Sequence, residues 1–228
     1  MKMKFGAIVT DGRGKIGGHV ASKNRSCAYL RTKVTPVNRQ SVAQSLVRNR
    51  FTTLAQAWRG LTAAQILAWN AAVAGYATTN IFGDLRNPSG INLFQSLNNV
   101  LLSIGKTVLT TPPAPAEVAQ IDIVSFTATS GTPTMVVTLG EQVPADTQVK
   151  VYATASMSAG KSFVKSEYRY IGCFASPHAA ALDIATLYTV KFGAIGAVGT
   201  KIFVQVEPVN ETTGQTGTVL ASSVILAA

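Results

Sequence analysis

Charged residues, and acidic ones above all, are scarce in this chain. Only 10 of its 228 residues are Asp or Glu, charged residues make up 13%, and apolar residues make up 47%. Disordered chains are richer in charge and poorer in apolar residues, so this composition predicts folded domains. It also carries little charge for a freely soluble monomer of this size. We therefore expect partners to cover much of its surface.

Long hydrophobic runs are absent as well. The chain has no stretch of about 18 apolar residues, which predicts that no helix spans a membrane. Met1–Val9 is basic with a short apolar run and no small-residue cleavage pattern, so we expect no secretory signal. Cys27 and Cys173 are too few for a disulfide framework, and this usage favours assembly in a reducing cytoplasm.

Residue patterns typical of catalysis are equally sparse. The two histidines lie far apart, and no Cys/His spacing predicts a metal site. Gly12–Gly17 matches the GxGxxG pattern, but no helical pattern follows it. The next acidic residue after Asp11 is Asp84, so the ribose-binding carboxylate of a dinucleotide site is lacking. The sequence predicts no enzyme, no cofactor and no small-molecule substrate.

What the chain does have is positive charge concentrated at one end. Residues 1–118 hold 14 Lys/Arg against three acidic residues, whereas residues 119–228 hold 6 against 7. Twelve of the cations precede Gly60 and are opposed by Asp11 alone. This asymmetry predicts contact with nucleic acid or an acidic protein surface. The candidate contact residues are Lys2, Lys4, Arg13, Lys15, Lys23, Arg25, Arg31, Lys33, Arg39, Arg48, Arg50 and Arg59.

Residues 1–38 are expected to form an extended basic arm. Phe5–Val9, Lys15–Val20 and Ala28–Val34 are short β-prone runs between glycine-rich turns. A core made of these runs alone is too small to be stable by itself. We expect neighbouring chains to order the arm.

Residues 39–109 are expected to form a small three-helix module. The helices are predicted over Arg39–Arg59, Ala63–Ala74 and Gly90–Ile104, separated by Gly and Pro breaks. Apolar residues recur at three- and four-residue steps in the first helix, which predicts one inward stripe. The stripe consists of Val42, Leu46, Val47, Phe51, Leu54 and Trp58.

The corner between the first two helices is the most specific local signal. Thr62 and Gln65 have the spacing of a capping box, and Leu61 and Ile66 that of a hydrophobic staple. The only two tryptophans flank this corner. The predicted core of the module is Trp58, Leu61, Thr62, Gln65, Ile66 and Trp69.

The rest of the chain is β-prone. Residues 110–119 contain three prolines in four positions and predict a stiff linker. Residues 120–228 alternate short strand-like runs with turn signals, which is typical of an Ig-like or fibronectin-III-like sandwich and completes an α+β fold. The predicted strands are Ile121–Thr127, Thr134–Leu139, Gln148–Thr154, Ser162–Ile171, Leu182–Val190, Lys201–Pro208 and Gly217–Leu226.

Several short motifs follow one another in order along residues 10–115. They are Gly12–Gly18, Asn24–Ser26, Tyr29–Arg31, Thr35–Asn38, Trp58–Thr62, Gln65, Trp69–Asn70, Ser89–Gly90, Asn92–Phe94 and Asn98. This order resembles a group of tailed-bacteriophage and prophage structural proteins that carry a W-x-x-L-T-x-x-Q-x-x-x-W helical hairpin. The resemblance implies a virion component that has no catalytic residues and ends in an Ig-like domain.

Three functions follow as hypotheses. The first is a non-enzymatic virion protein in a head–tail connector, tail ring or capsid, assembled in the host cytoplasm. Its partners would be copies of itself, the portal, capsid or tail proteins, and packaged DNA. The second is a nucleic-acid-binding protein that uses the basic first 60 residues. The third is surface or glycan adhesion through a tyrosine platform in the sandwich, whose residues would be Tyr152, Tyr168, Tyr170 and Tyr188.

Overall fold

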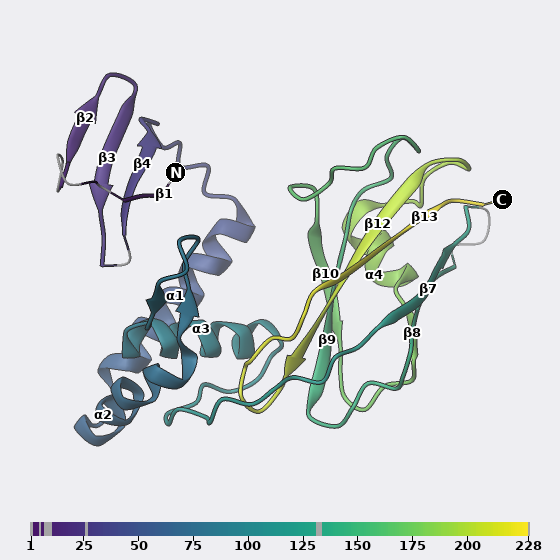
Figure 1. The fold of residues 1–228 in the computed structure, drawn as a ribbon. Coiled ribbons are helices and arrows are strands. Elements are labelled where there is room, and N and C mark those ends of the chain that lie inside the picture. The colour runs from purple at the N-terminus through teal and green to yellow at the C-terminus, as the bar shows by residue number, and fades with distance from the viewer. Residues whose placement is uncertain (1, 5, 7–10, 26, 131–133, 228) are drawn as a thin grey trace. The chain divides into compact units, whose positions relative to one another are not determined.

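The computed structural model describes the whole chain apart from residues 1, 5, 7–10, 26, 131–133 and 228 (Figure 1). The described residues contain four α-helices and several antiparallel sheets, which confirms the α+β class. They divide into two compact units. The first consists of residues 1–49 and 77–87, and the second of residues 50–76 and 88–228.

These units differ from the predicted segments. Residues 77–87, expected within the helical module, group with the N-terminal residues. The rest of the module groups with the β-rich residues, so the linker predicted at residues 110–119 does not divide two bodies.

The first unit contains a four-stranded antiparallel sheet rather than the extended arm expected from the sequence. Its strand order is β1-β4-β3-β2. The bounds are β1 Lys2–Met3, β2 Gly14–Ile16, β3 His19–Lys23 and β4 Ala28–Thr32. Ala21 and Ala28 are the only buried apolar residues that the structure describes in this unit. The sheet therefore depends mainly on its backbone ladder.

Glycines explain where the strands turn. The strand expected over Lys15–Val20 is instead a hairpin, because Gly17 takes a φ of 56° and reverses the chain between β2 and β3. The strand expected over Ala28–Val34 is present as β4. Of the strand expected over Phe5–Val9, all residues except Gly6 lie outside the described residues.

A second, shorter hairpin completes this unit. It consists of β5, Thr78–Thr79, and β6, Leu85–Arg86, which pair antiparallel. Gly83 lies in the connecting loop with a φ of 81°.

Helices dominate the start of the second unit. They are α1 Val42–Arg59, of which residues 50–59 belong here, α2 Ala63–Ala72, the 3₁₀ helix η1 Val73–Tyr76, and α3 Gly90–Ser103. Phe94 of α3 packs against both tryptophans, with its ring centroid 5.3 Å from that of Trp58 and 5.3 Å from that of Trp69. Leu54 and Trp69 are fully buried beside it.

The predicted capping box is confirmed. Thr62 Oγ1 accepts from the Gln65 N–H at 3.3 Å, and Gln65 Oε1 accepts from the Thr62 N–H at 2.9 Å. Thr62 is exposed and Gln65 is half-buried, so the pair fixes the start of α2 without belonging to the buried core. Leu61 packs on the core, but Ile66 is only half-buried and lies outside the buried cluster.

The inward stripe predicted for α1 is correct only at its end. Leu54 is buried and Trp58 is half-buried, because these turns face α2 and α3. The apolar residues earlier in the helix are exposed: Val42, Leu46, Val47 and Phe51.

Two antiparallel sheets fill the rest of the second unit and share one hydrophobic core. Their strand orders are β11-β8-β7 and β10-β9-β12-β13. The bounds are β7 Ile123–Ala128, β8 Met135–Leu139, β9 Thr147–Ala153, β10 Arg169–Phe174, β11 Ala181–Asp183, β12 Lys201–Asn210 and β13 Leu220–Ile225.

Two predicted strands are largely wrong. Ser162–Ile171 is loop and turn up to Tyr168, and only its last three residues belong to β10. The second is the strand predicted before the last two. Leu182–Val190 holds only the end of β11, followed by helix α4, Ala185–Phe192. Tyr188 and Phe192 stack with their ring centroids 4.9 Å apart and belong to the core together with Ile184. This four-residue spacing is that of a helix face, which the β-branched composition of the segment concealed.

The helices and the sheets of the second unit pack directly on each other. Leu101 of α3 and Ile104, which directly follows the helix, form a buried cluster with Val209 of β12. The Trp69 indole N–H donates to the Thr110 carbonyl at 2.9 Å, and the Tyr76 hydroxyl donates to the Pro113 carbonyl at 2.9 Å. The proline-rich segment is therefore held against the helices.

Candidate functional site

The positive charge of the chain is concentrated in the first unit. The difference in charge between the two units is clear relative to their sizes. Its 60 residues contain eleven Lys/Arg and two Asp, a formal balance of +9. The second unit contains nine Lys/Arg and eight Asp/Glu, a balance of +1. A field of this size attracts polyanions over a range set by ionic strength.

The register of the sheet places several cations on one face. Lys15 of β2 and Arg31 of β4 both lie opposite Val20 of β3. Lys2 of β1 lies opposite Tyr29 of β4. Tyr29 is two residues from Arg31, so Lys2, Tyr29 and Arg31 project from the same side of the sheet.

Lys33 extends the same face. Its backbone N–H donates to the Gly18 carbonyl at 2.8 Å, which continues the ladder beyond β4. We call this surface the basic face. Its members are Lys2, Lys15, Tyr29, Arg31 and Lys33. The four cations among them are exposed.

The opposite face of the sheet is the less polar one. Ala21 and Leu30 lie opposite each other, as do Lys23 and Ala28. The two alanines are buried and Leu30 is half-buried. The sheet is thus amphipathic, with its small apolar side separate from the basic face.

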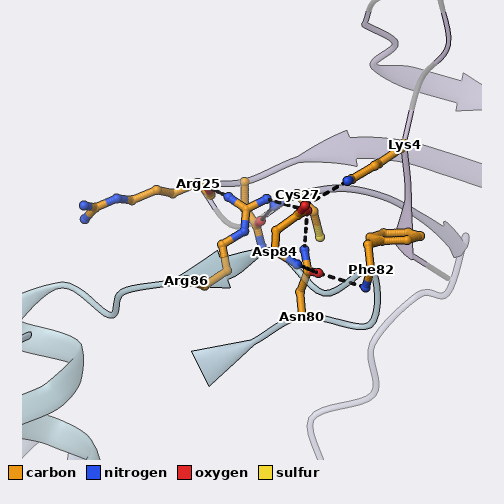
Figure 2. A network of polar contacts seen from close by, with 8 residues as sticks. Lys4, Arg25, Cys27, Asn80, Phe82, Asp84 and Arg86 are labelled. Atoms are coloured by element: carbon orange, nitrogen blue, oxygen red, sulfur yellow. Dashed lines mark hydrogen bonds and ion pairs between the residues drawn. The ribbon is translucent and has the colours of Figure 1, made fainter. Parts of the chain in front are cut away.

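Asp84 is one of the two acidic residues in this unit, and it holds the short hairpin to the N-terminal residues (Figure 2). Lys4 Nζ lies 2.9 Å from Asp84 Oδ1. The Asn80 amide donates to Asp84 Oδ2 at 3.0 Å, and Arg86 Nη2 lies 4.0 Å from the same oxygen. The hydrogen bond from Lys4, followed by that from Asn80, lowers the pKa of the Asp84 carboxyl.

The loop around Asp84 is itself ordered by Asn80. Asn80 Oδ1 accepts from the backbone N–H groups of Phe82 at 2.8 Å and Asp84 at 3.0 Å. Lys4 Nζ lies 5.4 Å from the centroid of the Phe82 ring, and Arg86 Nη1 donates to the Arg25 carbonyl at 3.3 Å (Figure 2). The hairpin therefore fastens two distant parts of the N-terminal segment.

Asp11 is the other acidic residue of this unit. Its Oδ2 lies 3.6 Å from Lys23 Nζ and 4.0 Å from Arg13 Nε. Within the described residues, no carboxylate lies within 4.0 Å of the four cations of the basic face. Asp11 and Asp84 thus pair with cations that do not belong to the basic face.

The remaining predicted cations are distributed elsewhere. Arg25 and Arg39 are exposed, and Arg48 donates to the Asn38 side chain at 3.0 Å. Arg50 and Arg59 belong to the second unit, where Arg50 is half-buried. The twelve candidates are therefore divided between the two units.

Sequence reasoning missed Asn80, Asp84 and Arg86. One signal was present, because Asp84 is the only acidic residue between Asp11 and Glu117.

The four tyrosines proposed as a platform do not share one exposed surface. Tyr188 is buried in the core, whereas Tyr152 and Tyr170 pack edge-on with ring centroids 5.6 Å apart. The Tyr152 hydroxyl donates to Glu207 Oε2 at 2.8 Å. Burial raises the pKa of Tyr152, and it raises the pKa of Tyr170 to about 12. Burial also lowers the pKa of Lys150, which lies opposite Glu207.

Within the part of the chain that the structure describes, no three His, Cys, Asp or Glu residues gather as a metal-binding group would require. None of the described helices combines the length and hydropathy needed to span a bilayer. No protein-family model matches the chain, and neither a curated protein nor a solved structure matches it.

Proposed function

We propose that this chain is a non-enzymatic structural component of a tailed-phage virion, assembled in multiple copies in the host cytoplasm. The observation that carries the proposal is the first unit itself. It has a formal charge of +9, and Ala21 and Ala28 are its only buried apolar residues among those described. A sheet with so little core gains stability from contact with another molecule.

The exposed part of α1 supports assembly independently. Val42 is 86% exposed and Leu46 is 48% exposed, although both follow the apolar spacing of an amphipathic helix. Contiguous exposed apolar residues are typical of interaction surfaces. The sequence of α1 contains no acidic residue, so a partner surface with negative charge fits it best.

We further propose that the two sheets form an Ig-like sandwich of the fibronectin-III kind. In chain order, strands one, two and five of the seven make one sheet, and strands four, three, six and seven make the other. An Ig constant domain has the first, second, fifth and fourth strands in one sheet, and here the fourth pairs with the third instead. The helices α1, α2 and α3 are proposed as the assembly module beside it.

Within the virion we favour a head–tail connector or tail ring over a capsid-associated position. Portal surfaces and packaged DNA are negatively charged environments, and the first unit is strongly basic. Other virion proteins and copies of the same chain are the expected partners.

Purified particles test the proposal. Mass spectrometry of particles from the producing cells is expected to find this chain at a constant ratio to the major capsid protein. Electron microscopy is expected to place it as a repeated feature at the head–tail junction or in the tail. Absence of the chain from mature particles would reject the proposal.

A further inference from the structure

We infer that the basic face binds the phosphate backbone of duplex DNA without sequence preference. This inference deepens the proposed function, on which it rests, because packaged DNA is the polyanion that a connector meets.

The cations of the basic face are spaced along and across the sheet. Lys15 and Arg31 lie on the two strands that flank Val20, so their backbones are about 10 Å apart across the sheet. Lys2 and Lys33 extend the same surface along β1 and beyond β4. Duplex DNA carries one negative charge per about 1.7 Å of its axis, so cations at this spacing all find phosphates.

Composition favours a nucleic acid over a protein. The cores of protein interfaces are depleted in lysine and are built on aromatic or aliphatic anchors in pockets. The basic face carries three lysines, one arginine and a single half-buried aromatic residue, Tyr29, and the half-buried Val20 lies between Lys15 and Arg31. Such a face offers point charges for phosphates and lacks a set of anchors for a protein.

The same composition favours the backbone of a duplex over bases or single strands. Single-stranded binding requires several aromatic side chains on which successive bases stack, and the basic face has only Tyr29. Base readout in the major groove requires a helix or a ribbon that enters it, and this surface is the broad side of a sheet. Contacts limited to phosphates carry no sequence information.

The acidic residues of the first unit lie away from the basic face and so do not reduce its positive electrostatic potential. Asp84 is paired with Lys4, and Asp11 lies near Lys23, which projects from the opposite side of the sheet. The charge of Lys2, Lys15, Arg31 and Lys33 is therefore not compensated locally within the described residues.

A salt titration with the full-length chain tests the inference. Fluorescence anisotropy with a labelled 30-base-pair duplex of mixed sequence, between 50 and 200 mM salt, gives the dependence of log K on log salt. Four phosphate contacts predict a slope of about −3.6, which is roughly a hundredfold loss of affinity over this range. A change of duplex sequence is expected to leave the affinity within about twofold.

Variants assign the binding to this face. Lys15→Ala/Arg31→Ala/Lys33→Ala removes three of the four contacts and is expected to reduce the slope to about −1. The matched control, Lys161→Ala/Lys165→Ala/Lys191→Ala, removes the same charge from the second unit and is expected to keep the slope. If the first variant fails to fold, the slope of the unmodified chain still decides whether phosphates are bound.

Several results would overturn the inference. They are a slope near zero, an equal loss in the control variant, or tighter binding to single-stranded DNA that Tyr29→Ala abolishes. Binding to polyglutamate as tight as to DNA would assign the face to an acidic protein instead. A chain present in particles but without DNA affinity refutes the inference alone, whereas a DNA-binding chain absent from particles refutes the proposed function alone.

Discussion

Asn98 connects α3 to the segment that leads into the β-sheets. It is fully buried, accepts from the Leu109 N–H at 2.6 Å, and donates to the carbonyls of Leu109 at 3.3 Å and Phe94 at 3.0 Å. The Asn98 side chain therefore pairs with the backbone N–H and carbonyl of Leu109, which lies in a loop and, among the described residues, has no strand or helix partner for these bonds. Removal of this side chain leaves the N–H and carbonyl of the half-buried Leu109 without this partner.

Asn98→Ala is expected to lower the free energy of unfolding by about 2 kcal/mol, the usual cost of buried unpaired backbone groups. Urea unfolding followed by tryptophan fluorescence measures it, since Trp58 and Trp69 lie in the same cluster. Asn92→Ala, an exposed change on the same helix, is the control and should stay within about 0.5 kcal/mol. Equal stability of the two variants would contradict this role for Asn98.

A second contact between the helical part and the sheets involves Glu211. This contact is expected to depend on pH. Glu211 Oε2 lies 2.8 Å from Lys106 Nζ and accepts from Gln148 at 3.0 Å. The hydrogen bond from Lys106, followed by that from Gln148, lowers the pKa of the Glu211 carboxyl below its usual 4.5. Its contribution to stability is therefore complete above pH 4.5 and is lost as the pH falls through the lowered pKa.

The measurement is the free energy of unfolding at several values between pH 6 and pH 3 for the unmodified chain and for Glu211→Gln. The variant is expected to lose less stability on acidification, because its amide does not titrate. Parallel pH profiles for the two proteins would show that this carboxylate is not a source of the acid sensitivity.

Residue-scale features differ in how far the sequence predicts them. Thr62 and Gln65 are three positions apart, so their mutual capping follows from helix geometry alone. Asn98 and Leu109 are eleven residues apart, and Lys4 and Asp84 eighty, so their pairing depends on tertiary structure. The basic face lies between these cases, since the cations are visible in the sequence but the register that aligns them is not.

At the scale of elements, α1 combines a folding role and an exposed apolar surface in one helix. Leu54 is buried with Trp69 and Phe94, whereas Val42 and Leu46 are exposed. A periodic pattern predicts which residues share a face but does not show how far along the helix a covering layer extends. The prediction of an inward stripe failed for this reason.

Substitutions along α1 separate the two roles. Leu54→Ala is expected to cost about 3 kcal/mol, since it leaves a cavity in the buried cluster. Val42→Gln/Leu46→Gln replaces exposed side chains and is expected to change stability by less than about 0.5 kcal/mol while it reduces incorporation into particles. Urea unfolding and the copy number in purified particles are the two measurements. Normal incorporation of the second variant would show that this surface is not used in assembly.

At the scale of the whole molecule, the two units differ in what stabilises them. The second has a large core shared by two sheets, in which Val149, Val151 and Val204 are fully buried. The first relies on backbone pairing, on two buried alanines and on polar contacts around Asp84. Because apolar burial is the main stabilising contribution, the first unit is expected to open at a lower free energy than the second.

Native-state hydrogen exchange measures this difference directly. Amides of β9 and β12 are expected to exchange only through global unfolding, whereas those of β3 and β4 are expected to exchange at least about 100-fold faster, through local opening. Duplex DNA at low salt, added in excess of its dissociation constant, is expected to slow exchange in β3 and β4 alone, since a ligand stabilises the unit that binds it. Lys15→Ala/Arg31→Ala/Lys33→Ala should remove this protection without changing β9 and β12. Equal protection of all four strands in the free chain would mean that the N-terminal sheet is as stable as the core of the second unit, and that its folding requires no partner.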